Sequence, residues 1–76
     1  MDLASLVKMA NQIGGFFEIY PDREYATQEV ASHIERFWNP RMRDAMQQRL
    51  AEAEALGLTP LAAAAIRRLA SARAPA

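Results

Sequence analysis

Residues 33–43 read HIERFWNPRMR, and this stretch decides how the chain is organised. A helical run ends here at Asn39-Pro40, because asparagine is a favoured helix N-cap and proline suits the first position of a new helix. The stretch also holds the only histidine and the only tryptophan of the chain, and it places Arg41 and Arg43 just after the break. We therefore expect a tight corner between two helices, surrounded by an unusual set of side chains.

On both sides of this corner, apolar residues recur at helical spacing, and no segment alternates as a strand does. The predicted helices span residues 2–19, 22–38, 40–56 and 60–72, and residues 73–76 are expected to fray. The sequence thus predicts a small all-α protein, a single domain over residues 1–76 with three or four helices. Short connections favour a bundle-like or orthogonal packing of neighbouring helices.

Residues that begin and end helices stand at the expected places. The predicted N-caps are Asp2, Asp22, Asn39 and Thr59, and Gly57 is the predicted left-handed terminator of the third helix. The pair Gly14-Gly15 lies inside the first predicted helix, where each glycine costs about 1 kcal/mol relative to alanine. Either the helix bends there or another backbone comes close.

The composition argues against several classes of protein. The chain has no cysteine, and its nine Lys and Arg balance nine Asp and Glu. Disulfides and thiolate metal sites are therefore excluded, and a nucleic-acid binder would normally carry a basic excess. No apolar run approaches the roughly 18 residues of a membrane span, and the N-terminus does not resemble a signal peptide. We expect a cytoplasmic protein that binds neither nucleic acid nor membrane and is stabilised by a partner chain.

No pattern of a catalytic site is found. Ser32 and His33 are adjacent, so on a helix their side chains point about 100° apart and cannot act as a pair. We expect no catalytic, cofactor-binding or metal-binding residue in this chain. His33 has two interpretations: a partly buried imidazole with one hydrogen-bond partner, or an interface contact or pH-sensitive hinge.

The apolar residues exceed what one narrow helical stripe requires. The larger ones are Phe16, Tyr20, Trp38, Met42 and Met46. They are either core residues or part of a patch that another chain completes, since interface centres favour aromatic residues, Met and Arg.

Arg41 and Arg43 lie at the start of the third predicted helix, where the helix dipole disfavours a cation. One explanation is pairing within the chain, with Asp44, Glu35 or Glu29. The other is that the two guanidinium groups bind a carboxylate or backbone carbonyls of a partner.

Three segments taken together carry a family resemblance. They are VKMANQIGGFFEIYP at residues 7–21, ASHIERFWNPRMR at residues 31–43 and GLTPLAAAAIRRL at residues 57–69. At this spacing they resemble the small delta subunit of soluble NAD-dependent formate dehydrogenases, over nearly the whole chain. The resemblance implies a cytoplasmic complex that oxidises formate to carbon dioxide and reduces NAD. Its catalytic large subunit would hold a molybdenum or tungsten pterin and iron–sulfur clusters, and other subunits FMN, the NAD site and further clusters.

The resemblance further implies that this chain is a non-catalytic accessory subunit that binds the large subunit and supports its assembly or stability. We expect the corner to be the docking face, with Phe37 in the core, Trp38 as the anchor beside it, and Asn11 bonded to a backbone group across the junction. The predicted partner-binding residues are Trp38, Arg41, Arg43, Met42, Pro40, His33, Asn11 and Phe16. Replacing Trp38 or Arg41 with alanine is expected to leave the helices largely intact and to weaken co-purification with the large subunit.

Two other functions stay open at this point. The same apolar surplus would suit a free-standing homodimer or helical adaptor without a redox role. The corner at Asn39-Pro40 also allows a small helix-turn-helix nucleic-acid binder, although the zero net charge argues against it.

Overall fold

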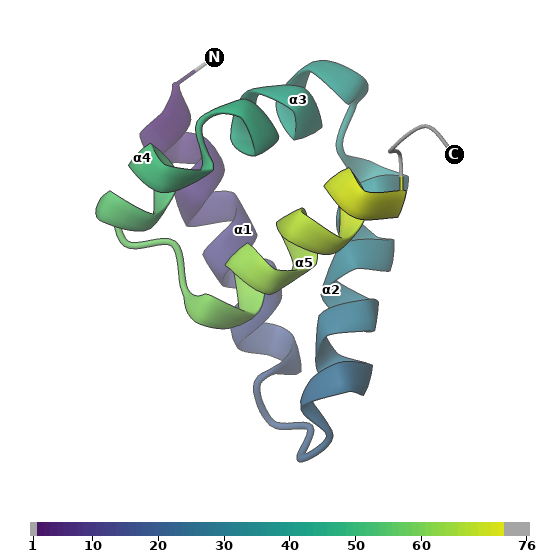
Figure 1. Cartoon of the computed structure of the whole chain (residues 1–76). Helices are drawn as coiled ribbons and strands as arrows, with labels where there is room; N and C mark the ends of the chain where they lie inside the picture. Colours follow the sequence, from purple (N-terminus) through teal and green to yellow (C-terminus); the bar gives the residue numbers. More distant parts are fainter. Residues whose placement is uncertain (1, 73–76) are drawn as a thin grey trace.

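The computed structural model of the chain describes residues 2–72, which contain helices and no strand (Figure 1). The helices are α1 (Leu3–Phe17), α2 (Arg23–Phe37), α3 (Pro40–Gln48), α4 (Leu50–Ala55) and α5 (Pro60–Ala72). The predicted all-α fold with short connections is confirmed. The predicted frayed tail at 73–76 lies outside the described residues.

The helices are arranged around the pair formed by α1 and α2. These two helices converge on the short loop that joins them, and α5 packs across both (Figure 1). The contact between α2 and α5 is the most extensive between any two helices of the described chain. α3 and α4 lie at the other end of the pair, away from the loop. The result is an open V of two helices with α5 laid over one side of it.

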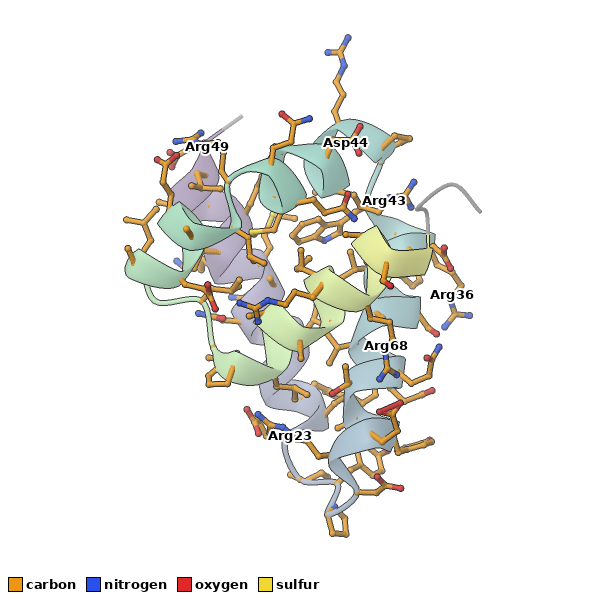
Figure 2. The ribbon with its side chains drawn as sticks, in the orientation of Figure 1. Arg23, Arg36, Arg43, Asp44, Arg49 and Arg68 are labelled. Atoms are coloured by element: carbon orange, nitrogen blue, oxygen red, sulfur yellow. The ribbon has the colours of Figure 1, made fainter. Side chains whose placement is uncertain are left out.

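The core lies where α5 meets the pair. Three alanines of α5, Ala62, Ala63 and Ala65, are completely buried, so their small side chains let α5 approach closely. The largest fully buried side chains are Leu6, Val30, Ile34, Met46, Leu61 and Ile66. At the surface of this contact, the guanidinium of Arg68 forms an ion pair with Glu24 (Figure 2). Exposed ion pairs of this kind add little stability, so the contact between α5 and the α1–α2 pair is held together by the burial of apolar area.

Three of the predicted N-caps are confirmed by hydrogen bonds. The side chains of Asp22, Asn39 and Thr59 each accept a bond from a backbone N–H in the first turn of the following helix. Asp2 precedes α1 but accepts a bond from the hydroxyl of Ser5 in place of a backbone N–H. The local sequence therefore fixes where α2, α3 and α5 begin.

The predicted continuous helix over residues 40–56 is wrong, because the segment breaks at Arg49 into α3 and α4. Arg49 has φ −116° and ψ 33°, outside the helical region. Its guanidinium donates two hydrogen bonds to the carboxylate of Glu52, which lower the pKa of Glu52 and raise the pKa of Arg49. No glycine or proline marks this position. The break lies between Met46 and Ala53, both fully buried, so each of the two short helices keeps a residue in the core.

The loop between α4 and α5 begins with the predicted left-handed glycine. Gly57 has φ +103°, and its N–H donates to the carbonyl of Glu54. The N–H of Leu58 donates to the carbonyl of Ala53 at 3.0 Å. This pair of bonds is the Schellman motif, which satisfies the last carbonyls of a helix. The predicted role of Gly57 is confirmed.

The first helix ends at Phe17, two residues before the predicted end, and its two glycines differ in their surroundings. A Cβ built on Gly14 would lie 3.6 Å from Oγ1 of Thr59 and 3.7 Å from Cβ of Ala62. A Cβ on Gly15 would meet nothing within 4 Å. The helix is continuous through both glycines, and only Gly14 faces another element, the start of α5, at ordinary van der Waals distance.

Candidate functional site

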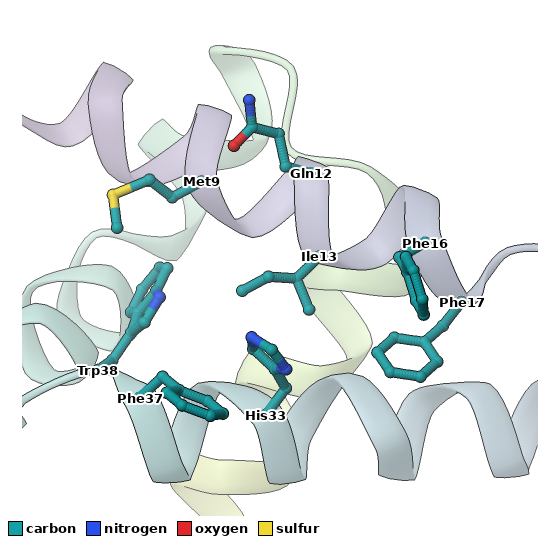
Figure 3. Close-up of a pocket in the computed structure, with 8 residues that line it drawn as sticks. All are labelled: Met9, Gln12, Ile13, Phe16, Phe17, His33, Phe37 and Trp38. Carbon is teal, nitrogen blue, oxygen red and sulfur yellow. The ribbon is translucent and has the colours of Figure 1, made fainter.

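An open groove lies between α1 and α2, on the side of the pair that α5 does not cover (Figure 3). Its volume is about 510 Å³. It is lined by Met9, Gln12, Ile13, Phe16 and Phe17 from α1 and by His33, Phe37 and Trp38 from α2 and its C-cap. In Figure 3 most of these side chains lie toward the space between the two helices, whereas the amide of Gln12 points away from α2.

Large apolar side chains on the rim of the groove face solvent. Phe16 is 72% exposed, Phe37 is 68% exposed and Met9 is 39% exposed. Ile13 and Phe17 are half-buried and pack against the core, so they form the floor. Exposed apolar residues are ordinary when they are scattered, but a contiguous set in a concave place is typical of a binding surface.

The groove offers few polar groups. Its polar side chains are Gln12, His33 and the indole N–H of Trp38. His33 is half-buried and its ring centroid lies 4.6 Å from that of Phe37, but within residues 2–72 its ring has no hydrogen-bond partner. The predicted partly buried imidazole is therefore found without the predicted bond. A site of this kind binds apolar groups and contains no nucleophile beside a general base.

Other kinds of site were sought over the same part of the chain. Among the described residues, no group of three or more His, Cys, Asp or Glu side chains is placed to hold a metal ion. None of the described helices combines the length and the apolar character that crossing a bilayer requires. The groove is thus the candidate site that the structure supports best.

Residues 5–66 match the family model of the NADH-dependent formate dehydrogenase delta subunit, FdsD. The chain belongs to this family. The matched range contains every residue of the groove and most of the helical fold. No match was found among curated proteins or among solved structures. The resemblance inferred from three sequence segments is confirmed, and the chain is a delta subunit by family.

The residues predicted to bind a partner in this delta-subunit chain are not all brought together. Phe16 and His33 lie on the walls of the groove, as a binding role requires. Trp38 contacts the groove as well but is only 5% exposed, whereas Phe37 is 68% exposed. The expectation of Phe37 in the core is therefore wrong, and Trp38, expected as the anchor beside it, takes the core position instead.

This difference has a simple cause on α2. Its buried face comprises Ala26, Thr27, Val30, Ala31 and Ile34, and it continues at Trp38. The core-facing stripe thus runs through Thr27, Ala31 and Trp38 and leaves His33 and Phe37 at its other edge, outside the core. Trp38 is also outside the helix, with φ −90° and ψ 142°, so a helical projection does not give its direction.

Asn11 forms backbone hydrogen bonds, but they are within its own chain. Its side-chain amide donates to the carbonyl of Gly57 at 2.9 Å and accepts from the N–H of Thr59 at 2.9 Å. These bonds fasten α1 to the loop between α4 and α5. The predicted bond across a partner junction is therefore corrected to a structural role.

The position of Arg43 at the start of α3 is explained by a hydrogen bond that it makes to the end of α2. Its guanidinium donates to the backbone carbonyl of Glu35 at 2.7 Å, close to the C-terminus of α2 (Figure 2). A cation there satisfies an otherwise unpaired carbonyl and is favoured by the negative end of the helix dipole. The unfavourable interaction of this cation with the dipole of α3 is thus offset by its favourable interaction with the end of α2. Of the two explanations for Arg43, the structure supports pairing within the chain.

The other residues of the predicted docking corner lie outside the groove. Met42 is half-buried and packs against the core, whereas Pro40 and Arg41 are exposed on the first turn of α3. A partner contact of Arg41 stays a prediction. Of the corner, only Trp38 and the preceding end of α2 line the groove.

Sequence reasoning did not assign Met9, Gln12, Ile13, Phe17 and Phe37 to the site. The signal was present on α1, because Met9, Ile13 and Phe16 follow the spacing i, i+4, i+7 beside the buried stripe. On α2 the matching signal is His33 and Phe37 at i, i+4. A second apolar stripe that does not face the core on two consecutive helices predicts a shared groove.

Proposed function

We propose that this chain is a non-catalytic accessory subunit of a cytoplasmic NAD-dependent formate dehydrogenase. In this proposal it binds the catalytic large subunit through the α1–α2 groove and supports the assembly or stability of that subunit. The observation that carries the proposal is the exposure of Phe16 and Phe37 in a concave apolar site of a chain whose family is a delta subunit.

The cofactors of the parent enzyme belong, in this proposal, to other subunits. A molybdenum or tungsten pterin, the iron–sulfur clusters, FMN and NAD would all be held outside this chain. Supporting this division, the sequence has no cysteine with which to hold a cluster. The described residues likewise contain no set of three or more metal-ligating side chains. What this chain offers a partner is apolar area.

The test is co-expression of the affinity-tagged large subunit and the other subunits of the enzyme with three forms of this chain. These are the wild type, Phe37→Ser in the groove, and Leu56→Ser as the matched control. Leu56 is 55% exposed but lies at the end of α4, outside the groove. Truncating a central aromatic anchor typically costs 2 kcal/mol or more, so Phe37→Ser should weaken the affinity for the large subunit at least about 30-fold. Less of this chain should then be recovered with the tagged large subunit. Leu56→Ser should bind as the wild type does.

The accessory role itself is measured by omitting this chain. We expect the large subunit to be recovered at lower yield, or to lose formate-dependent NAD reduction faster on warming, and adding the wild-type chain should restore both. If the wild-type chain does not co-purify with the large subunit, or if its omission changes neither yield nor inactivation rate, the proposed function is overturned.

A further inference from the structure

Most of the groove's walls offer no free backbone groups for an occupant to bond. Met9, Gln12 and Ile13 lie inside α1, and His33 lies inside α2, where backbone N–H and C=O groups pair within the helix. At the end of α2, the N–H of Trp38 donates to the carbonyl of Ile34, and the carbonyl of Glu35 accepts from Arg43. An extended strand laid into the groove would therefore bury its own N–H and C=O groups without partners, which is unfavourable. A helix satisfies its own backbone and brings only side chains to the site.

The length of the groove also matches a helix. From Met9 to Phe16 is seven residues of α1, which corresponds to about 10 Å along the axis, or two helical turns. Two turns present apolar side chains at i, i+3 or i+4, and i+7 on one face. Those side chains would pack against Ile13 and Phe17 on the floor and between Phe16 and Phe37 on the rim.

The available area is too small for two copies of this chain to pair stably through the groove alone. A phenylalanine side chain offers roughly 150–250 Å² when fully exposed. With Phe16 and Phe37 about two-thirds exposed and Met9 39% exposed, the rim offers a few hundred Å². A stable interface needs roughly 800 Å² from each partner. The groove therefore suits the centre of an interface whose remaining area comes from a larger protein.

We infer that the α1–α2 groove receives an amphipathic helix of a larger protein chain, with its apolar face turned toward Ile13 and its two ends near Trp38 and Phe17. This inference rests on the proposed function for the identity of that chain, the catalytic large subunit. The imidazole of His33 lies beside the apolar floor and can receive a polar side chain at the edge of the helix's apolar face.

Photo-crosslinking of the assembled complex tests the inference. The residue p-benzoylphenylalanine replaces Met9, Phe16 or Phe37, one at a time, and replaces Leu56 as the control outside the groove. All four side chains are exposed, so the fold is expected to persist, and circular dichroism of each variant checks it. Crosslinked peptides are then identified by mass spectrometry.

We expect the three groove positions to crosslink to one segment of the large subunit, at residues spaced by three, four or seven, and the Leu56 position not to reach that segment. Spacing by two, which indicates an extended segment, would overturn the inference. So would crosslinks to a second copy of this chain, or groove positions that stay silent in a complex that does assemble. Failure of this chain to co-purify with the large subunit would instead overturn the proposed function.

Discussion

The two sides of α2 differ in how completely their large side chains are buried. Toward α5, Ile34 and Val30 are fully buried, and the buried residues of α5 include three alanines. Toward the open side of α1, His33 and Phe37 line a groove, and Phe37 is 68% exposed although it stands only three residues after Ile34. Small side chains thus close one gap between helices, and large side chains border the other gap without filling it.

The difference shows where the folding free energy of the isolated chain comes from. On the closed side, helices held close by alanines bury their larger neighbours completely, so that side should dominate stability. On the open side, the aromatic rings gain little from folding because they remain in water. Their apolar area is left for association, which is where an accessory subunit would use it.

The difference between the two sides of α2 is tested most strongly by truncating two neighbouring residues, Trp38 and Phe37, one at a time. We expect Trp38→Ala to lower the free energy of unfolding by ~3–5 kcal/mol, because the indole is 5% exposed and its loss leaves a cavity. Phe37→Ala should change it by no more than about 1 kcal/mol, because the ring is already in water. Urea unfolding followed by far-ultraviolet circular dichroism measures both, since it does not depend on the tryptophan.

If Trp38→Ala prevents folding altogether, Trp38→Phe serves in its place and should still lose more stability than Phe37→Ala. Equal stability of the Trp38 and Phe37 variants would contradict the assignment of one residue to the core and the other to the groove. The expectation from sequence that Trp38→Ala leaves the helices intact is reversed by this placement.

Much of the fold could be predicted because the signals are local. The cap at Asp22, the corner at Asn39-Pro40 and the left-handed turn at Gly57 each depend on the backbone geometry of one or two residues, and all three are confirmed. The break at Arg49 could not be predicted, because nothing in the local sequence interrupts a helix there. It depends on how α3 and α4 pack against the rest of the chain, which is non-local.

The candidate site was predicted less well than the fold, for a physical reason that α2 illustrates. Bulky residues dominate a helical stripe when it is drawn from sequence, which placed Phe37 inside. The true buried face is marked by Ala31 and Thr27, two small side chains that carry little hydrophobic signal but permit close packing against α5. Family resemblance indicated what the chain is, but only the packing of α5 shows which aromatic residues remain exposed.

The two sides of α1 give a second comparison, between the adjacent residues Asn11 and Gln12. Asn11 joins α1 to the loop before α5 through two hydrogen bonds, whereas Gln12 is exposed at the edge of the groove, with its amide directed away from α2. We expect Asn11→Ala to destabilise the fold by ~1–3 kcal/mol, because the N–H of Thr59 and the carbonyl of Gly57 lose their partner. Gln12→Ala should stay within about 0.5 kcal/mol of the wild type. Thermal and urea unfolding of both variants measure this, and an equal loss in the two would show that the loop does not depend on Asn11.

The smallest effects are expected from two glycines in different backbone conformations, and they should have opposite signs. Gly57→Ala forces a Cβ into a backbone with φ +103° in the Schellman turn, which costs about 1–2 kcal/mol. Gly15→Ala adds a methyl group to α1 where nothing lies within 4 Å, so it should raise the free energy of unfolding by roughly 0.5–1 kcal/mol through better helix propensity. Urea midpoints at constant slope distinguish a gain from a loss. A destabilising Gly15→Ala would mean that another part of the protein occupies the space beside Gly15, which is open in this structure.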